Sequence, residues 1–180
     1  MTGAAVVYGR SLYELAAEES LEKQILDELD GICRLFDENP QYAKLLSEPS
    51  ISKKERCALI EETFGGRVHL YVDNFLKVLC ENNIMHELHG CMREFRRRYY
   101  EANGILTATA VSASPMTPEQ TERLREKLIR LTGHPVELSA KTDPKCIGGV
   151  RLDIDGKRLD GTVRERLDAM RALLMGSSGI

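Results

Sequence analysis

The stretch Gly104-Ile-Leu-Thr-Ala-Thr-Ala-Val111 decides the fold class, because the spacing of apolar residues changes there. Upstream of it, apolar side chains recur every three or four residues, the spacing of one face of an α-helix. The stretch itself contains β-branched residues and is followed by Ser112-Ala-Ser-Pro115, a combination that predicts a strand. We therefore expect an α+β chain, with a helical bundle over residues 1–104 and a small α/β module over residues 105–180.

Six amphipathic segments precede Gly104, and short links join them, so the pattern predicts a six-helix bundle. The fourth segment has the clearest start, because Ser52 and Glu55 form a capping box in which each side chain satisfies a free backbone N–H. The six segments run from Ala5 to Glu18, Leu21 to Phe36, Tyr42 to Leu46, Ser52 to Phe64, Val68 to near Asn82, and Ile84 to about Ala102.

Downstream of the first strand, strand and helix signals alternate. Thr117 and Gln120 form a second capping box, which predicts a helix ending at Gly133. Asp155-Gly156 is a strong two-residue hairpin signal, and Thr162 with Glu165 predicts the cap of a last helix. The remaining strands are expected at Val136–Lys141, Val150–Ile154 and Lys157–Leu159.

The composition is that of an ordinary globular protein, with 42% hydrophobic and 29% charged residues. No apolar run approaches the roughly 18 residues that span a bilayer, and the first residues lack the pattern of a signal peptide. The net charge of -3 is uneven. Residues 1–104 hold 13 Lys and Arg against 18 Asp and Glu, whereas residues 105–180 hold 12 against 10. This asymmetry suggests that the two modules face different partners.

The five cysteines are odd in number, widely spaced and without a C-x-x-C pair. Such a pattern favours reduced, buried thiols over a disulfide framework. The cysteines are Cys33, Cys57, Cys80, Cys91 and Cys146.

Residues that could carry chemistry are few. His86-x-x-His89-x-Cys91 has metal-ligand residue types, but on a helix Cys91 points away from both histidines and no fourth ligand is near in sequence. Gly148-Gly149 precedes a strand instead of opening a helix, which argues against a phosphate-binding loop. We expect no catalytic, cofactor-binding or metal-binding residue and no enzymatic activity.

The basic run Arg96-Arg97-Arg98, followed by Tyr99-Tyr100, leaves a second hypothesis open. Arginines interleaved with aromatic rings are used to bind nucleic acid. The structural interpretation is that Tyr99 belongs to an apolar helix stripe and that the arginines complement the negative end of the helix dipole. A nucleic-acid-binding helical adaptor is therefore the alternative function.

Three stretches, taken together, carry a resemblance to a known family: Val7-Tyr-Gly-Arg-Ser-Leu-Tyr-Glu-Leu-Ala16, Phe75-Leu-Lys-Val-Leu-Cys-Glu-Asn-Asn83, and Ile147-Gly-Gly-Val-Arg-Leu-Asp-Ile-Asp-Gly-Lys-Arg-Leu-Asp-Gly-Thr-Val-Arg-Glu-Arg-Leu167. They resemble the delta subunit of F-type ATP synthases, the family of the mitochondrial oligomycin-sensitivity-conferring protein. The third stretch is the most specific. One departure is Gly9, which stands where the family usually has alanine.

The resemblance implies a non-catalytic stator subunit, without cofactor, that joins the catalytic head of the synthase to its peripheral stalk at the cytoplasmic face of the cell membrane. The bundle would bind the N-terminal helix of an alpha subunit in an apolar groove between its first and fifth helices, and the C-terminal module would hold the b subunits. No nucleic acid and no direct membrane insertion are implied. Projected onto this chain, the groove residues are Tyr8, Leu12, Leu15, Val72, Phe75, Leu76 and Leu79.

Overall fold

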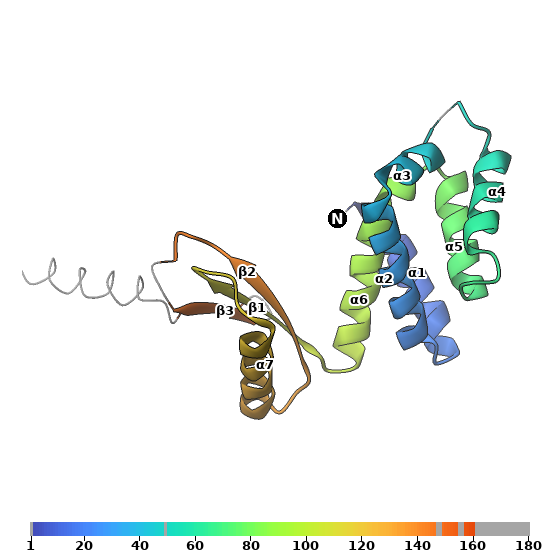
Figure 1. Ribbon diagram of the computed structural model, residues 1–180. Helices are drawn as coiled ribbons and strands as arrows, with labels where there is room; N and C mark the ends of the chain where they lie inside the picture. Colours follow the sequence, from blue (N-terminus) through green and yellow to red (C-terminus); the bar gives the residue numbers. More distant parts are fainter. Residues whose placement is uncertain (1, 49, 147–148, 155–156, 161–180) are drawn as a thin grey trace, which may run out of the picture. The chain divides into compact units, whose positions relative to one another are not determined.

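The computed structural model describes residues 2–48, 50–146, 149–154 and 157–160, the last four by their backbone only. The chain divides into two compact units, a helical unit over residues 1–99 and an α/β unit from residue 100 onward (Figure 1). Helices and strands are both present in the described residues, so the predicted α+β class is confirmed.

The helices before the first strand are α1 (Gly3–Glu18), α2 (Glu22–Glu38), α3 (Pro40–Leu46), α4 (Lys53–Phe64), α5 (Leu70–Glu81), the short 3-10 helix η1 (Met85–Glu87) and α6 (Leu88–Ala102). Their starts follow from local chemistry. Thr2 caps α1, Ser52 and Glu55 form the predicted capping box of α4, and Pro40 occupies the first turn of α3.

Helices α1 and α3 begin two residues before their predicted starts at Ala5 and Tyr42, whereas two other helices begin later than predicted. Val68 lies outside α5, because His69 is the N-cap and its Nδ1 accepts a hydrogen bond from the Tyr71 N–H at 3.2 Å. The last helix of the unit does not begin at Ile84. Asn83 adopts a left-handed backbone with φ 56°, so the chain turns there and forms η1 before α6 begins.

The core of the helical unit is formed by the inward stripes of these helices. Phe95, Ile25, Leu29, Leu46, Ile60, Leu76, Leu79 and Val72 are all fully buried. One buried charge ties three segments together. The Arg56 side chain donates to the Leu46 carbonyl at 3.0 Å and to Asn83 Oδ1 at 2.8 Å, because a buried guanidinium must find acceptors inside the protein.

Helices α1 and α6 approach each other closely at two glycines. A Cβ added to Gly9 would lie 2.4 Å from the Cys91 carbonyl oxygen, and one added to Gly90 would lie 2.8 Å from Ala5 Cβ. One turn along, the rings of Tyr13 and Phe95 pack edge to face at 5.5 Å. Gly9 therefore lets the two backbones touch where a larger residue would separate them.

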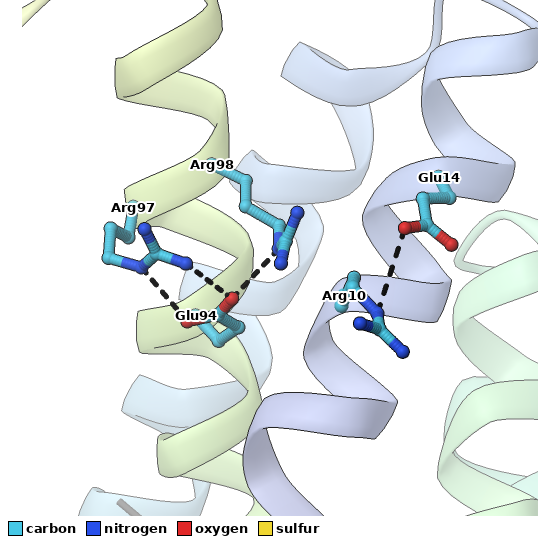
Figure 2. A network of polar contacts seen from close by, with 5 residues as sticks. All are labelled: Arg10, Glu14, Glu94, Arg97 and Arg98. Atoms are coloured by element: carbon cyan, nitrogen blue, oxygen red, sulfur yellow. Dashed lines mark hydrogen bonds and ion pairs between the residues drawn. The ribbon is translucent and has the colours of Figure 1, made fainter.

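A buried carboxylate lies at this junction (Figure 2). The Glu94 side chain is 2% exposed and accepts hydrogen bonds from Arg97 Nε at 3.0 Å, Arg97 Nη2 at 2.7 Å and Arg98 Nε at 2.8 Å. These guanidinium groups, Arg97 foremost, hold the pKa of Glu94 below its ordinary value, against the opposing effect of burial. On the neighbouring helix, Arg10 pairs with Glu14 at 3.7 Å.

The α/β unit contains β1 (Leu106–Ser112), α7 (Pro118–Thr132), β2 (Val136–Thr142), β3 (Val150–Ile154) and β4 (Lys157–Asp160). Its strands form one sheet in the order β2-β1-β3-β4. β1 pairs with β2 in parallel, so α7 is the crossover helix between them. β3 and β4 pair antiparallel with Ile154 opposite Lys157, as the hairpin signal predicts.

Helix α7 packs against one face of this sheet (Figure 1). Leu128 of α7 lies with Ala108 and Val136 in a small apolar core, and Leu124 and Leu138 pack around it. The predicted capping box of Thr117 and Gln120 is present, and Gly133 ends α7 with φ 72°. The predicted cap of Thr162 and Glu165 falls outside the described residues.

Candidate partner-binding surface

Helices α1 and α5 contact each other and run antiparallel. The Tyr71 hydroxyl at the start of α5 donates to Glu19 Oε1, just past the end of α1, at 2.6 Å. This hydrogen bond raises the pKa of the Tyr71 phenol. The bond joins the start of α5 to the chain just past the end of α1.

The direction in which each side chain points follows from the helical repeat of about 100° per residue. On α1, Gly9 and Tyr13 face α6, and the helical repeat turns Tyr8, Ser11 and Leu15 away from it; we infer that this flank borders α5, because Glu19, four residues after Leu15, bonds Tyr71. On α5, Lys77 and Cys80 face α4 through contacts with Glu61 and Cys57. Tyr71, Phe75 and Val78 therefore occupy the flank toward α1.

We call this strip the α1–α5 seam, defined by Tyr8, Ser11, Leu15, Tyr71, Phe75 and Val78. It is apolar and partly open. Leu15 is 45% exposed and Val78 is 38% exposed, while Tyr8 and Tyr71 are half-buried. Phe75, at 7%, forms its floor. No member of the seam carries a charge, so the surface suits the apolar side of an amphipathic helix.

The seven predicted groove residues divide into two sets. Tyr8, Leu15 and Phe75 belong to the seam. The other four, Leu12, Val72, Leu76 and Leu79, are at most 3% exposed and form the core beneath it. These four side chains can shape the seam, but they offer a partner almost no surface.

Three members of the seam, Ser11 on α1 and Tyr71 and Val78 on α5, were missed by the sequence argument. Val78 lies three residues after Phe75 and Tyr71 lies four residues before it, so both fall beside it on the same helix flank. The apolar stripe used for the prediction centres on Val72, Leu76 and Leu79, which are the most deeply buried positions of α5. Partly exposed apolar side chains such as Val78 lie at the edge of such a stripe, and that edge was the available signal.

The histidine–cysteine cluster is not assembled as a metal site in the described ranges, where no group of three or more potential ligands occurs. His86 is exposed, and its Nε2 lies 3.6 Å from Glu87 Oε1. His89 Nε2 lies 3.3 Å from Asp37 of α2. Cys91 is instead buried against α1, where its carbonyl faces Gly9. The three side chains therefore serve different contacts.

The arginine run also has internal partners. Arg96 pairs with Asp30 of α2, and Arg97 and Arg98 both pair with Glu94. Each guanidinium thus pairs with a carboxylate of the same chain, so the run presents less net positive charge than its sequence alone indicates.

Within the described part of the chain, no helix has the length and apolar character needed to cross a membrane.

Comparison with known proteins decides the family. The model of the ATP synthase delta (OSCP) subunit family matches residues 4–174. The chain belongs to this family. A delta subunit of this kind is a structural part of the ATP synthase stator, and it is not itself catalytic.

Similar proteins agree with this assignment. The chain is 34% identical over 167 residues to an ATP synthase subunit delta of Desulfitobacterium hafniense, covering 93% of each chain. It is 33% identical over 171 residues to that of Erythrobacter litoralis, covering 94% of this chain and 92% of the other. Its fold matches a chain of the Toxoplasma gondii mitochondrial ATP synthase hexamer with a TM-score of 0.76, at 14% identity and coverage of 97% and 98%.

Proposed function

We propose that this delta subunit links the catalytic head of a proton-translocating F-type ATP synthase to its peripheral stalk, at the cytoplasmic face of the cell membrane. A head held in this way does not turn with the rotor, so rotation is converted into ATP synthesis. The helical unit would act as a six-helix bundle that binds the alpha subunit. The α/β unit, with residues 105–180, would bind the b subunits.

The α1–α5 seam is the observation that carries the alpha-subunit contact. The seam is an uncharged strip with Leu15 and Val78 exposed at its two sides, over a floor formed by Phe75. A partner helix placed there would bury the side chains of Leu15 and Val78, while the polar residues around the seam would stay in contact with water. Such a contact gains its free energy from apolar burial, and its specificity from the spacing of the apolar residues of the partner.

Calorimetric titration of the full chain with a synthetic peptide copying the N-terminal helix of the alpha subunit tests this contact. We expect binding by the wild type, and at least about tenfold weaker binding by Leu15→Asp and Val78→Asp, equivalent to about 1.4 kcal/mol. A charge at either position would have to lose its water when the partner helix covers it.

Leu131→Asp is the matched control, because Leu131 is an apolar residue of α7 that is 82% exposed and lies in the other unit. This variant is expected to bind the peptide as the wild type does. Binding that is absent in the wild type, or unchanged in both seam variants, would contradict the proposed alpha-subunit contact.

The b-subunit contact is proposed for the α/β unit on the basis of charge. Residues 105–180 hold 12 Lys and Arg against 10 Asp and Glu, whereas residues 1–104 are net acidic. A basic balance suits acidic stalk helices, and an attraction of this kind weakens as salt is added. Co-purification from membranes, with alpha and b subunits recovered together at low salt, tests both partners; recovery of neither would refute the stator role.

A further inference from the structure

Helices α4 and α5 each carry a thiol, Cys57 and Cys80, and Cys57 lines a surface hollow. The hollow has a volume of about 510 Å³ and is lined by Lys53, Lys54, Cys57, Glu81 and Asn82. Cys57 is half-buried there, whereas Cys33, Cys80, Cys91 and Cys146 are all buried. Cys57 is therefore the described thiol that a small molecule reaches from solvent.

Cys80 lies directly behind Cys57. Cys57 Sγ is 4.0 Å from the backbone oxygen of Lys77, one turn before Cys80 on the same helix. After burial, the Cys57 thiol is the next cause that raises the pKa of the Cys80 thiol. Helices α4 and α5 lie side by side (Figure 1), so Cys57 of α4 reaches α5 within one turn of Cys80.

The two thiols differ in their exposure to solvent, and this difference determines which of them reacts first. Cys80 is fully buried and donates to the Leu46 carbonyl at 3.8 Å. Burial raises the pKa of the Cys80 thiol to about 11, so its thiolate forms less readily and Cys80 reacts after Cys57. Cys57 borders the hollow, where the ammonium groups of Lys53 and Lys54 attract an anionic reagent.

We propose that Cys57 is a modification site for a low-molecular-weight disulfide of the glutathione type, and that Cys80 resolves the adduct into a Cys57–Cys80 disulfide. In the first step, Cys57 sulfur attacks the reagent, a mixed disulfide forms, and one glutathione leaves with the Cys57 proton. In the second step, Cys80 sulfur attacks Cys57 sulfur, and the second glutathione leaves with the Cys80 proton. The two thiols are oxidised by two electrons, and one glutathione disulfide is reduced to two thiols.

The other cysteines are less accessible than Cys57, so we expect the reagent to modify Cys57 first. Cys33 and Cys91 lie near each other, but both are buried, and burial raises the pKa of Cys33 to about 12 and of Cys91 to about 11. Neither offers the half-exposed first nucleophile that Cys57 provides. The proposed disulfide lies on the flank of α5 that faces away from the α1–α5 seam, so it is independent of the partner proposed above.

Incubation of the full native chain with glutathione disulfide, followed by intact mass measurement and peptide mapping, tests the proposal. We expect the wild type to lose the mass of two hydrogen atoms and to yield one linked peptide pair containing Cys57 and Cys80. Cys80→Ala should retain one glutathione on Cys57, because no resolving thiol remains. Cys57→Ser should gain neither the adduct nor the crosslink.

Cys146→Ser is the control and should form the crosslink as the wild type does. A wild-type chain that stays unmodified, stops at the Cys57 adduct, or links any other pair of cysteines would overturn the proposal. The wild-type peptide map gives this answer even if a substitution at the buried Cys80 prevents folding.

Discussion

Glu94 shows how one residue links the sequence to the stability of the helix pair α1–α6. Its carboxylate is buried, yet it is satisfied by three hydrogen bonds from two arginines that follow it on the same helix. The arginines remain partly exposed, with side chains 45% and 27% accessible. The ion pairs thus lie at the edge of the core, where an ionised carboxylate is stabilised by neighbours but still costs free energy to desolvate.

The lowered pKa of Glu94 predicts an acid-sensitive contribution to stability. A carboxyl group whose pKa is lower in the folded chain stabilises it above the unfolded value of about 4.3, and this contribution is lost as pH falls through the folded pKa. We expect the free energy of unfolding to fall less steeply between about pH 5 and pH 3 in Glu94→Gln than in the wild type. Urea denaturation at a series of pH values measures this; equal slopes would contradict it.

Gly9 predicts a steric effect at the same junction. A Cβ there would lie 2.4 Å from a backbone oxygen of α6, which cannot rotate away. We expect Gly9→Ala to lower the free energy of unfolding by about 1–3 kcal/mol, as overpacking does.

Gly31→Ala in α2 is the matched control for that substitution. Nothing lies within 4 Å of a Cβ added at Gly31, so alanine should stabilise the helix by roughly 0.5–1 kcal/mol. Denaturant unfolding of both variants should therefore give opposite signs, and the same sign in both would contradict the close approach at Gly9.

At the scale of the element, the two apolar neighbours Val78 and Leu79 predict different outcomes. Leu79 is fully buried, whereas Val78 is 38% exposed. We expect Leu79→Ala to lower the free energy of unfolding by about 2–5 kcal/mol through the cavity that it leaves, and Val78→Ala to cost less than about 1 kcal/mol. Denaturant unfolding of both variants measures the contrast. Similar losses in both would mean that the flank of α5 toward α1 belongs to the core and not to a partner surface.

The elements were predictable where local chemistry sets them. Ser52 and Thr117 start helices through capping boxes that can be read from residue spacing alone. The end of α5 near Asn82 and Asn83 was predicted, but the late start of α6 was not, because the left-handed backbone of Asn83 accompanies a hydrogen bond from the buried Arg56, 27 positions earlier in the chain. The seam was predicted only in part, since periodicity finds the centre of an apolar stripe, and the burial of its edge depends on which helix packs beside it.

At the scale of the whole molecule, the helical unit has its own core, made of side chains from α1 to α6. We expect a fragment of residues 1–104 to fold by itself. Circular dichroism should show a helical spectrum, and urea should unfold the fragment in one cooperative transition. A fragment without helical signal would show that the core depends on the α/β unit.

Amino-acid composition alone did not predict which partner each of the two units binds. The charge asymmetry between residues 1–104 and 105–180 predicts different partners but names neither. The Arg96–Arg98 run shows why: Asp30 and Glu94 balance two of its three positive charges, and the pairing with Asp30 of α2 is not visible in the local sequence.

The strand order β2-β1-β3-β4 also determines when β1 can pair with its neighbours during translation. β1 is the first strand to leave the ribosome, yet both of its neighbours in the sheet are made later, with Val136–Thr142 and then Val150–Ile154. Until then its two edges are open to any other strand nearby. The helical unit is complete earlier and can fold first, as N-terminal domains generally do. The nascent chain is therefore most vulnerable to aggregation in the interval between translation of Ser112 and translation of Ile154.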